Sequence, residues 1–207
     1  EGFILTVEIF VLTLLFSLPL GMIVAFGRMS RIGIIRTLSK LYISVMRGTP
    51  LMLQIIVVYF GPFYAFGIRM GSGYRFPAVI IAFVINYAAY FAEIFRGGIM
   101  SIDNGQFEAG RSLGFNYIQT MRNIVIPQAV KSTLPTLLNE VIALLKETSV
   151  AGYVGIMDLT KAGDLIRGRT FEAFMPLIAV AIIYLITVVV LTHVFTTIER
   201  RLRRSER

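Results

Sequence analysis

The sequence predicts an all-α integral membrane protein with five transmembrane helices and one short cytoplasmic helix. Of the 207 residues, 56% are hydrophobic and only 15% are charged, and the mean hydropathy is +0.76. Soluble chains are nearer to half apolar, with about a quarter of their residues charged, so this composition indicates a bilayer as the solvent. With no cysteine and a single histidine, His193, the sequence offers no disulfide and no histidine-built metal site.

Five stretches are apolar enough to be transmembrane helices, which need roughly 20 residues to cross the hydrocarbon core. Stretches 4–26 and 173–195 are the clearest, and we expect both to face lipid. Stretches 50–66 and 77–92 are flanked by charges, and stretch 128–146 is interrupted by charges and proline, so these three should face protein or water. The expected spans, within a single domain over 1–207, are approximately 3–27, 41–66, 76–97, 124–146 and 172–197.

The distribution of basic residues predicts the orientation. Thirteen of the 20 Lys and Arg residues lie in loop 27–40, loop 96–131 and the tail 199–207. Five spans put these three segments on one side, which the positive-inside rule assigns to the cytoplasm. The formal net charge of +8 is therefore interpreted as a topology signal, and no nucleic-acid partner is expected.

The polar stretch 108–127, EAGRSLGFNYIQTMRNIVIP, lies on this cytoplasmic side. As a helix over 106–118 it would place Gly110 and Gly114 four residues apart, on a face that lets another backbone approach closely. Pro127 then begins the next span, where a missing N–H is harmless. From the residues alone, this helix either binds a partner or lies on the lipid headgroups.

The same stretch resembles the EAA loop of ABC-importer permeases, which reads Glu-Ala-small, three residues, Gly, nine residues, Ile, one residue, an aliphatic residue and Pro. This chain supplies Glu108, Ala109, Gly110, Gly114, Ile124, Ile126 and Pro127 at those spacings. It departs from the usual pattern at Gly110, where the family has Ala, and at Ile126, where it has Leu. Stretches 47–54, 92–99 and 139–152 also resemble permeases of polar amino-acid uptake systems, of the histidine, arginine and glutamine type.

The resemblance covers roughly residues 3–200 and implies a type I importer permease of the prokaryotic plasma membrane, with a cytoplasmic C-terminus. Its implied partners are an ABC ATPase subunit, a second permease subunit and an extracytoplasmic substrate-binding protein; a homodimer is favoured and a heterodimer stays open. The coupling residues would be Glu108, Ala109, Gly110, Arg111 and Gly114. Because the sequence has no G-x-x-x-x-G-K-[ST] phosphate loop, ATP and Mg are expected on the ATPase and no cofactor in this chain.

Polar residues near or within the spans are the candidates for binding a transported solute. A zwitterionic amino acid needs an acceptor for its ammonium and a donor for its carboxylate, and a basic side chain needs a further carboxylate. Glu140 and Glu147 are two helical turns apart on one face, and Asp158 follows a glycine-containing segment expected to interrupt the helix. The candidate substrate residues are Glu140, Glu147, Thr148, Ser149, Met157 and Asp158, with Arg47 as the donor.

Structural alternatives exist for these residues. Glu140 or Glu147 could pair with Lys146, Asp158 could cap a helix, and Arg47 could extend to the headgroups. Glu93 and Arg96, at i and i+3, are expected to form an ion pair.

Two functions are compared. The favoured one is ATP-driven import of polar, preferentially basic, amino acids by alternating access. The alternative, a stand-alone channel or ion-coupled secondary transporter for a small polar solute, would explain the acids within the spans but not the glycine-containing cytoplasmic helix.

Overall fold

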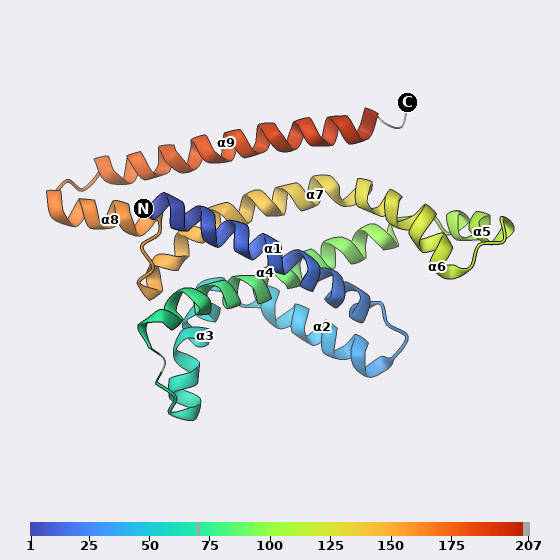
Figure 1. Cartoon of the computed structure of the whole chain (residues 1–207), viewed down its shortest axis with the longest axis horizontal. Helices are drawn as coiled ribbons and strands as arrows, with labels where there is room; N and C mark the ends of the chain where they lie inside the picture. The colour runs from blue at the N-terminus through green and yellow to red at the C-terminus, as the bar shows by residue number, and fades with distance from the viewer. Residues whose placement is uncertain (70, 205–207) are drawn as a thin grey trace.

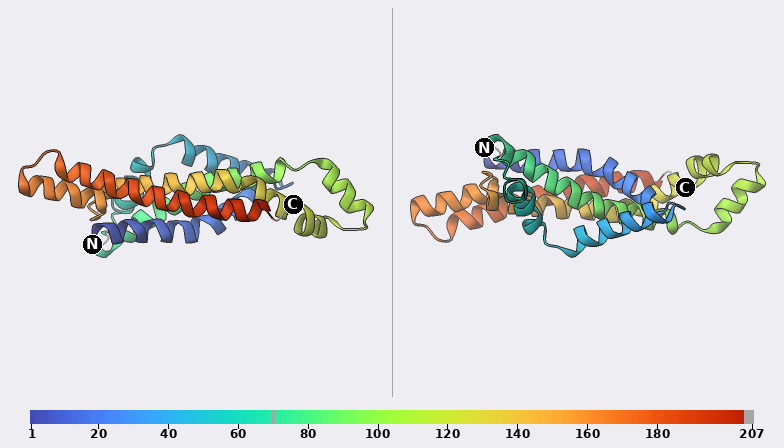
Figure 2. Two further views of the ribbon diagram at one scale, coloured as in Figure 1. Left: turned by 90° about the horizontal axis from the view of Figure 1, so that it is seen from above. Right: turned by 90° about the horizontal axis from the view of Figure 1, so that it is seen from below.

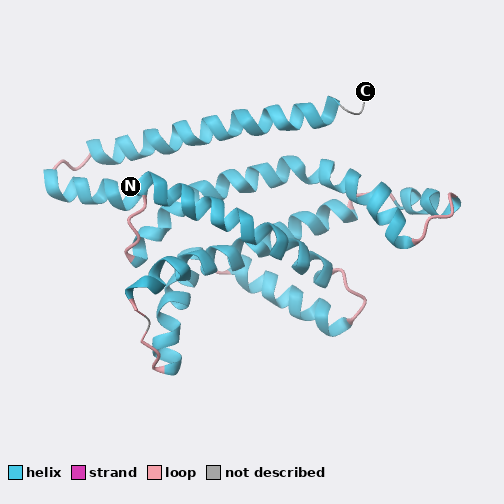
Figure 3. Cartoon of the chain, viewed as in Figure 1, coloured by secondary structure: helices cyan, strands magenta, loops and turns pink. Residues whose placement is uncertain are grey.

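The computed structural model describes residues 1–69 and 71–204, with only the backbone described at 72 and 201–204. Every regular element in this part of the chain is helical (Figure 3), which confirms the predicted all-α fold. The side chains of the basic tail 201–207, used above to predict the orientation, lie outside the described set.

Nine α-helices and three segments of 3₁₀ or π-helix make up the regular structure of the described chain. The α-helices are α1 (Gly2–Arg28), α2 (Gly33–Gly48), α3 (Leu51–Phe66), α4 (Arg75–Met100), α5 (Asn104–Ser112), α6 (Tyr117–Thr120), α7 (Ile126–Glu147), α8 (Leu159–Thr170) and α9 (Met175–Arg204). The others are the 3₁₀ segments η1 (Ser72–Tyr74) and η3 (Thr148–Val154) and a π-helical turn, η2 (Met121–Val125).

The long helices run along the long axis of the molecule in alternating directions. Figure 1 shows α1, α4 and α9 pointing one way and α7 pointing back. The N-terminus and α8 lie at one end, here called the α8 end. Helices α5 and α6 and the end of α9 lie toward the opposite end, called the α5 end, and both views in Figure 2 agree. The loop after α1 also lies at the α5 end (Figure 1), so the segments expected in the cytoplasm gather on one side.

Helix lengths and hydropathy identify the membrane-crossing elements. Three helices, at Gly2–Arg28, Arg75–Met100 and Met175–Arg200, are long and apolar enough to cross a bilayer, and the bent pair α2–α3 would be a fourth. Helix α7 has 22 residues but carries Lys131, Glu140, Lys146 and Glu147, which corresponds to the weaker fifth stretch in the sequence.

The expected continuous helix over 41–66 is divided in two. Helices α2 and α3 meet at an angle of 108°, because Thr49 and Pro50 are extended and Pro50 cannot donate a hydrogen bond. The amide of Gln54 donates to the carbonyls of Met46 and Thr49, at 2.9 and 3.2 Å. Asn86 of α4 also donates to Met46, at 3.1 Å. Side chains thus satisfy the carbonyls that the break exposes, as an apolar environment requires.

Helix α1 packs closely on α4, although the sequence predicted that it faces lipid. Its buried residues form one stripe, made of Gly2, Thr6, Ile9, Thr13, Ser17, Gly21 and Ala25. A Cβ atom at Gly21 would lie 2.8 Å from the Cβ of Phe91 and 3.1 Å from the carbonyl oxygen of Ala88. The small residues therefore let the two backbones approach, as in many membrane helix pairs. In α9, by contrast, no residue of the apolar window is buried, so its side chains are left to lipid or a partner.

Replacing Gly21 with leucine is expected to destabilise the fold by about 1–3 kcal/mol, because the new side chain overpacks the α1–α4 contact. Thermal unfolding in detergent, followed by circular dichroism, measures this change. Gly97→Ala is the matched control, since a Cβ at Gly97 meets no atom within 4 Å. Equal unfolding temperatures for wild type and Gly21→Leu would contradict the packing argument.

Candidate functional site

A cleft of about 430 Å³ opens between α4 and α7. Residues spaced three or four apart on each helix line it: Tyr90, Glu93, Ile94, Gly97, Gly98 and Ser101 from α4, and Ser132, Thr133, Thr136 and Glu140 from α7, with Arg47 from the end of α2. The two helices touch where a Cβ at Gly98 would lie only 1.9 Å from Cγ2 of Thr133. Polar side chains of two helices thus face one space.

The cleft contains charges of both signs. The guanidinium carbon of Arg47 lies 5.2 Å from the centre of the Tyr90 ring, a cation–π contact that holds the cation at the cleft wall. Glu140 lines the same cleft and forms no hydrogen bond or ion pair with any residue in 1–69 or 71–204. The structure therefore brings together two of the predicted residues, Arg47 and Glu140, and the sequence alternative of a Glu140–Lys146 pair is not found in these ranges.

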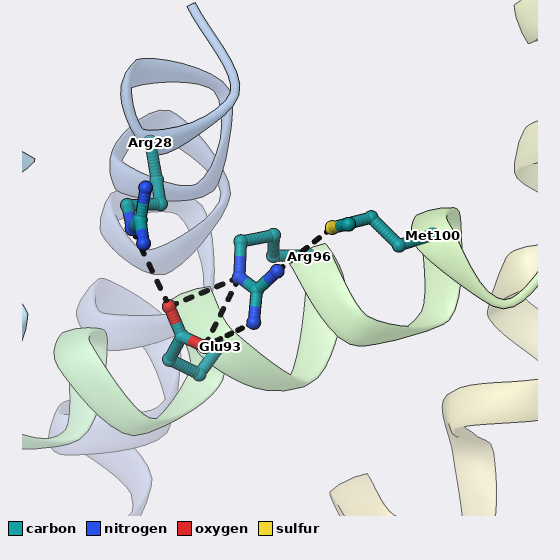
Figure 4. A network of polar contacts seen from close by, with 4 residues as sticks. All are labelled: Arg28, Glu93, Arg96 and Met100. Atoms are coloured by element: carbon teal, nitrogen blue, oxygen red, sulfur yellow. Dashed lines mark hydrogen bonds and ion pairs between the residues drawn. The ribbon is translucent and has the colours of Figure 1, made fainter. Parts of the chain in front are cut away.

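Glu93 is held by two arginines, as Figure 4 shows. Nη2 of Arg96 lies 2.7 Å from Glu93 Oε2, and Nε of Arg96 donates to both carboxylate oxygens at 3.0 and 3.1 Å. Arg28, at the end of α1, lies 4.0 Å from Oε1, and Arg96 also contacts the sulfur of Met100. The predicted Glu93–Arg96 pair is confirmed within α4, and the contact of Arg28 with Glu93 joins α1 to α4 near the α5 end. Among the described residues, Glu93 thus forms ion pairs, whereas Glu140 forms none.

Glu147 lies one step further toward the α8 end. The hydroxyl of Tyr87 donates to Glu147 Oε2 at 2.8 Å, and the buried Tyr87 ring lies 5.9 Å from that of Tyr90. Tyr87, Tyr90 and Glu93 follow one another at i, i+3 and i+6 on α4. The sequence analysis did not single out Tyr87 or Tyr90, although their spacing from Glu93 was the signal that could have found them.

The remaining candidates lie away from the cleft. Thr148 is buried and donates to the carbonyl of Leu145 at 2.7 Å, while Met157 is 39% exposed. Ser149 lines a separate cleft of about 410 Å³ at the α8 end, with Lys161 and Arg167. These three residues are therefore not brought into the cleft of Arg47 and Glu140.

Asp158 is the N-cap of α8, the structural alternative considered for it. Its carboxylate is fully buried and accepts from the backbone N–H groups of Lys161, at 2.9 Å, and Thr160, at 3.4 Å. Burial raises the pKa of Asp158 above its ordinary value, although these backbone hydrogen bonds oppose the shift. Leu159 N–H donates to Thr6 at 3.0 Å, so the cap also fixes α8 against the start of α1.

Asp158→Ala is expected to lower the free energy of unfolding by about 1 kcal/mol, because a helix cap is lost. Asp158→Asn keeps an acceptor and should stay near wild type. Because the folded-state pKa is raised, ionisation of Asp158 opposes folding, and its contribution to stability is lost as pH rises through that pKa. Unfolding measured against pH should show this slope in wild type and a smaller one in Asp158→Asn; identical slopes would contradict the burial argument.

The polar segment at the α5 end is more folded than the sequence predicted. Asp103 caps α5 by accepting from Gly105 N–H at 2.6 Å, and α5 ends at Ser112 instead of continuing to 118. Gly114 has a φ of +77°, and Phe115 N–H bonds back to the carbonyl of Gly110 at 2.9 Å, which is a helix-terminating geometry that glycine favours.

The expected open face with Gly110 and Gly114 is therefore wrong. Gly110 is buried, and a Cβ there would lie 2.6 Å from the Thr120 hydroxyl, so the close approach occurs between α5 and α6 of this chain. The two helices are also joined by the stacked rings of Phe107 and Tyr117, whose centres are 6.5 Å apart.

The outer surface of this segment carries apolar groups. Leu113, Tyr117 and Ile118 are 70%, 65% and 75% exposed, and Glu108, Ala109 and Arg111 are exposed beside them. Clustered apolar side chains of this kind mark an interaction surface.

Two contacts connect this segment to α7. The π-helical turn η2 joins α6 directly to α7, and Gln128 of α7 donates to Gln106 of α5 at 3.0 Å. The surface is thus mechanically connected to the helix that carries Glu140.

Comparisons with known proteins agree with this architecture. The family described as "Binding-protein-dependent transport system inner membrane component" matches residues 17–204. A putative glutamine transport system permease of Rickettsia bellii is 35% identical over 202 residues, covering 98% of this chain and 91% of the relative. An arginine transport system permease of Bacillus subtilis is 34% identical over 206 residues, covering 100% of this chain and 93% of the relative.

Solved structures show the same fold. A chain from the crystal structure of an amino acid ABC transporter with histidines has a TM-score of 0.89 and 38% identity, over 97% of this chain and 92% of that one. A chain of the inward-facing MetNI methionine ABC transporter has a TM-score of 0.72 at 20% identity, over 96% of this chain and 91% of that one, and shows the fold alone. The chain belongs to the family of inner membrane components of binding-protein-dependent transport systems.

Proposed function

We propose that this chain forms the translocation pathway of an ATP-driven importer for polar, preferentially basic, amino acids. The observation that carries the proposal is the cleft between α4 and α7, where Arg47 offers donors and Glu140 offers a carboxylate with no hydrogen bond or ion pair among the described residues. An amino acid carries one carboxylate and one ammonium, and a basic side chain adds a second cation for Glu140 or Glu147. The names of the glutamine and arginine relatives support this class of solute.

A separate ABC ATPase, which binds ATP and Mg, would drive transport by docking on the exposed surface of α5 and α6. This surface consists of Glu108, Ala109, Arg111, Leu113, Tyr117 and Ile118. Closure of the ATPases moves α5 and α6, and η2 transmits the movement to α7, so that the cleft opens alternately to the two sides. π-Helical turns are frequent at functional positions. The α5 end, with the C-terminus, is then cytoplasmic, as the basic loops predict.

A second permease subunit would complete the pathway, and an extracytoplasmic binding protein would deliver the solute at the α8 end. Within the described residues, α9 buries none of its apolar window against the chain. A two-fold pair of such chains would close the cleft and cover part of this apolar surface.

Reconstitution tests the proposal. The chain is purified with its ATPase, placed in proteoliposomes with its binding protein, and assayed for uptake of radiolabelled arginine, histidine and glutamine. We expect uptake that requires ATP and the ATPase, with arginine or histidine preferred. Uptake by the chain alone, without the ATPase, would instead favour the stand-alone channel or secondary transporter.

A further inference from the structure

Arg75, the first residue of α4, lies on an aromatic platform at the α8 end. Its guanidinium carbon is 6.0 Å from the centre of the Tyr59 ring. The Tyr59 ring stacks on that of Tyr74, with centres 6.4 Å apart and planes 15° apart, and the Tyr74 hydroxyl donates to the carbonyl of Val58 at 3.2 Å. Because α3 and η1 hold both rings, the cation sits at a defined position.

Gly155 closes the site from the other side. It follows η3 and has a φ of +80°, which glycine adopts without strain. A Cβ at this position would lie 3.2 Å from Nη1 of Arg75. A side chain there would crowd the guanidinium, so the absence of one leaves the cation room beside the backbone.

The donors of Arg75 are unused. Its Nε is buried without a hydrogen-bond partner, and within residues 1–69 and 71–204 the side chain forms no hydrogen bond or ion pair. Arg96 and Arg167, by comparison, each contact a carboxylate, at 2.7 and 2.6 Å. A buried N–H donor without a hydrogen-bond acceptor destabilises the folded protein. A planar guanidinium can donate two parallel hydrogen bonds to one carboxylate.

We propose that Arg75 receives the carboxylate of the transported amino acid at the mouth of the pathway, before the solute reaches Glu147 and Glu140. This inference rests on the proposed function. Arg75 precedes Tyr87, the partner of Glu147, by 12 residues of α4, or about 18 Å of helix. The guanidinium of Arg75 therefore lies nearer the α8 end of α4 than the Tyr87–Glu147 pair does, and a solute that enters from that end meets Arg75 first. Arg47, the donor predicted from the sequence, would serve the inner cleft.

The test compares arginine with agmatine, which has the same guanidinium but no carboxylate. Equilibrium binding of each radiolabelled compound is measured on the permease–ATPase complex in nanodiscs, without binding protein, so that only this complex selects the ligand. We expect wild type to bind arginine at least about tenfold more tightly than agmatine, because a charge-assisted pair is lost with the carboxylate. Arg75→Gln should reduce this preference to within about twofold, chiefly by weakening arginine binding.

Three further variants make the result decisive. Arg169→Gln, an exposed change at the same end, should keep the wild-type preference. Tyr59→Leu retains the guanidinium but removes its platform, and should lower the preference partly; it carries the test if Arg75→Gln does not fold. If Arg47→Gln removes the preference while Arg75→Gln does not, the carboxylate is received in the inner cleft and the assignment to Arg75 is wrong.

The other outcomes are equally clear. If Arg75→Gln weakens the binding of arginine and of agmatine equally, Arg75 has a structural role and the inference is overturned. The inference is also overturned if the wild-type complex binds the two compounds with equal affinity. A wild-type complex that does not bind arginine contradicts the proposed function itself. A complex that binds amino acids normally in both wild type and Arg75→Gln contradicts only the role of Arg75.

Discussion

Replacing Gly110 with leucine is expected to reduce ATP-driven uptake by more than about tenfold while the chain still inserts into the membrane. A Cβ at this position would already lie 2.6 Å from Oγ1 and 2.7 Å from Cγ2 of Thr120. Leucine therefore forces α5 away from α6, at an overpacking cost of about 1–3 kcal/mol. That separation displaces the exposed surface of Leu113, Tyr117 and Ile118 that is proposed to dock on the ATPase.

Uptake and ATPase stimulation in proteoliposomes measure the effect, and the thermal stability of the variant shows whether the α1–α4–α7 bundle is intact. Gly114→Asn is the matched control, because Asn tolerates the left-handed backbone at φ +77°, and it should retain coupling. Gly110→Ala should reduce uptake less than Gly110→Leu does. Adding Thr120→Ala to Gly110→Ala should restore uptake, because it removes Oγ1 and Cγ2, the two atoms nearest to the new Cβ. Full coupling in Gly110→Leu would show that the α5–α6 contact is not needed.

Neutralising Glu140 is expected to have the second large effect, on selectivity. Glu140→Gln should raise the concentration of arginine for half-maximal uptake by about thirtyfold, because an ionic hydrogen bond contributes about 2 kcal/mol. Glutamine uptake should change much less, since a neutral side chain does not require the carboxylate. Within residues 1–69 and 71–204 no hydrogen bond or ion pair occupies the Glu140 carboxylate, so its oxygens are available to a cationic solute.

Competition between radiolabelled arginine and glutamine in one preparation measures this change without errors in protein concentration. Glu172→Gln is the control, because Glu172 is exposed in the α8–α9 loop, and it should leave both uptake rates unchanged. Glu140→Asp keeps the negative charge but shortens the side chain, so it tests whether the position of the carboxylate matters. An equal loss of both solutes in Glu140→Gln would assign the residue to the architecture of the cleft and not to selectivity.

Much of the fold could be predicted because its signals are local. Apolar length identified the helices that became α1, α4 and α9, since a backbone in lipid must satisfy its hydrogen bonds within the helix. The i, i+3 spacing also predicted the Glu93–Arg96 pair, which the structure confirms at 2.7 Å. The segment 108–127 was recognised from its own residues, and its position beside a long helix followed from hydropathy.

The interior of that segment was predicted less well. A helix through 118 is what a periodic pattern favours, but a single glycine at φ +77° ended α5 at Ser112. Likewise, a continuous span was expected over 41–66, whereas the chain bends by 108° after Gly48 and depends on Gln54 and Asn86 to satisfy the carbonyls left at the break. Whether such partners are present is decided by neighbouring helices and not by the segment itself.

By itself, the sequence determined that the chain is a helical membrane protein with a folded polar segment on its basic side, because hydropathy, charge and short motifs act over a few neighbouring residues. Only the tertiary structure decided which polar groups meet. It joined Glu147 to Tyr87, placed Arg47 and Glu140 in one cleft, and used Asp158 as a helix cap. The physical reason is that the direction of a side chain around its helix, and the depth at which two helices cross, depend on packing between segments far apart in the chain.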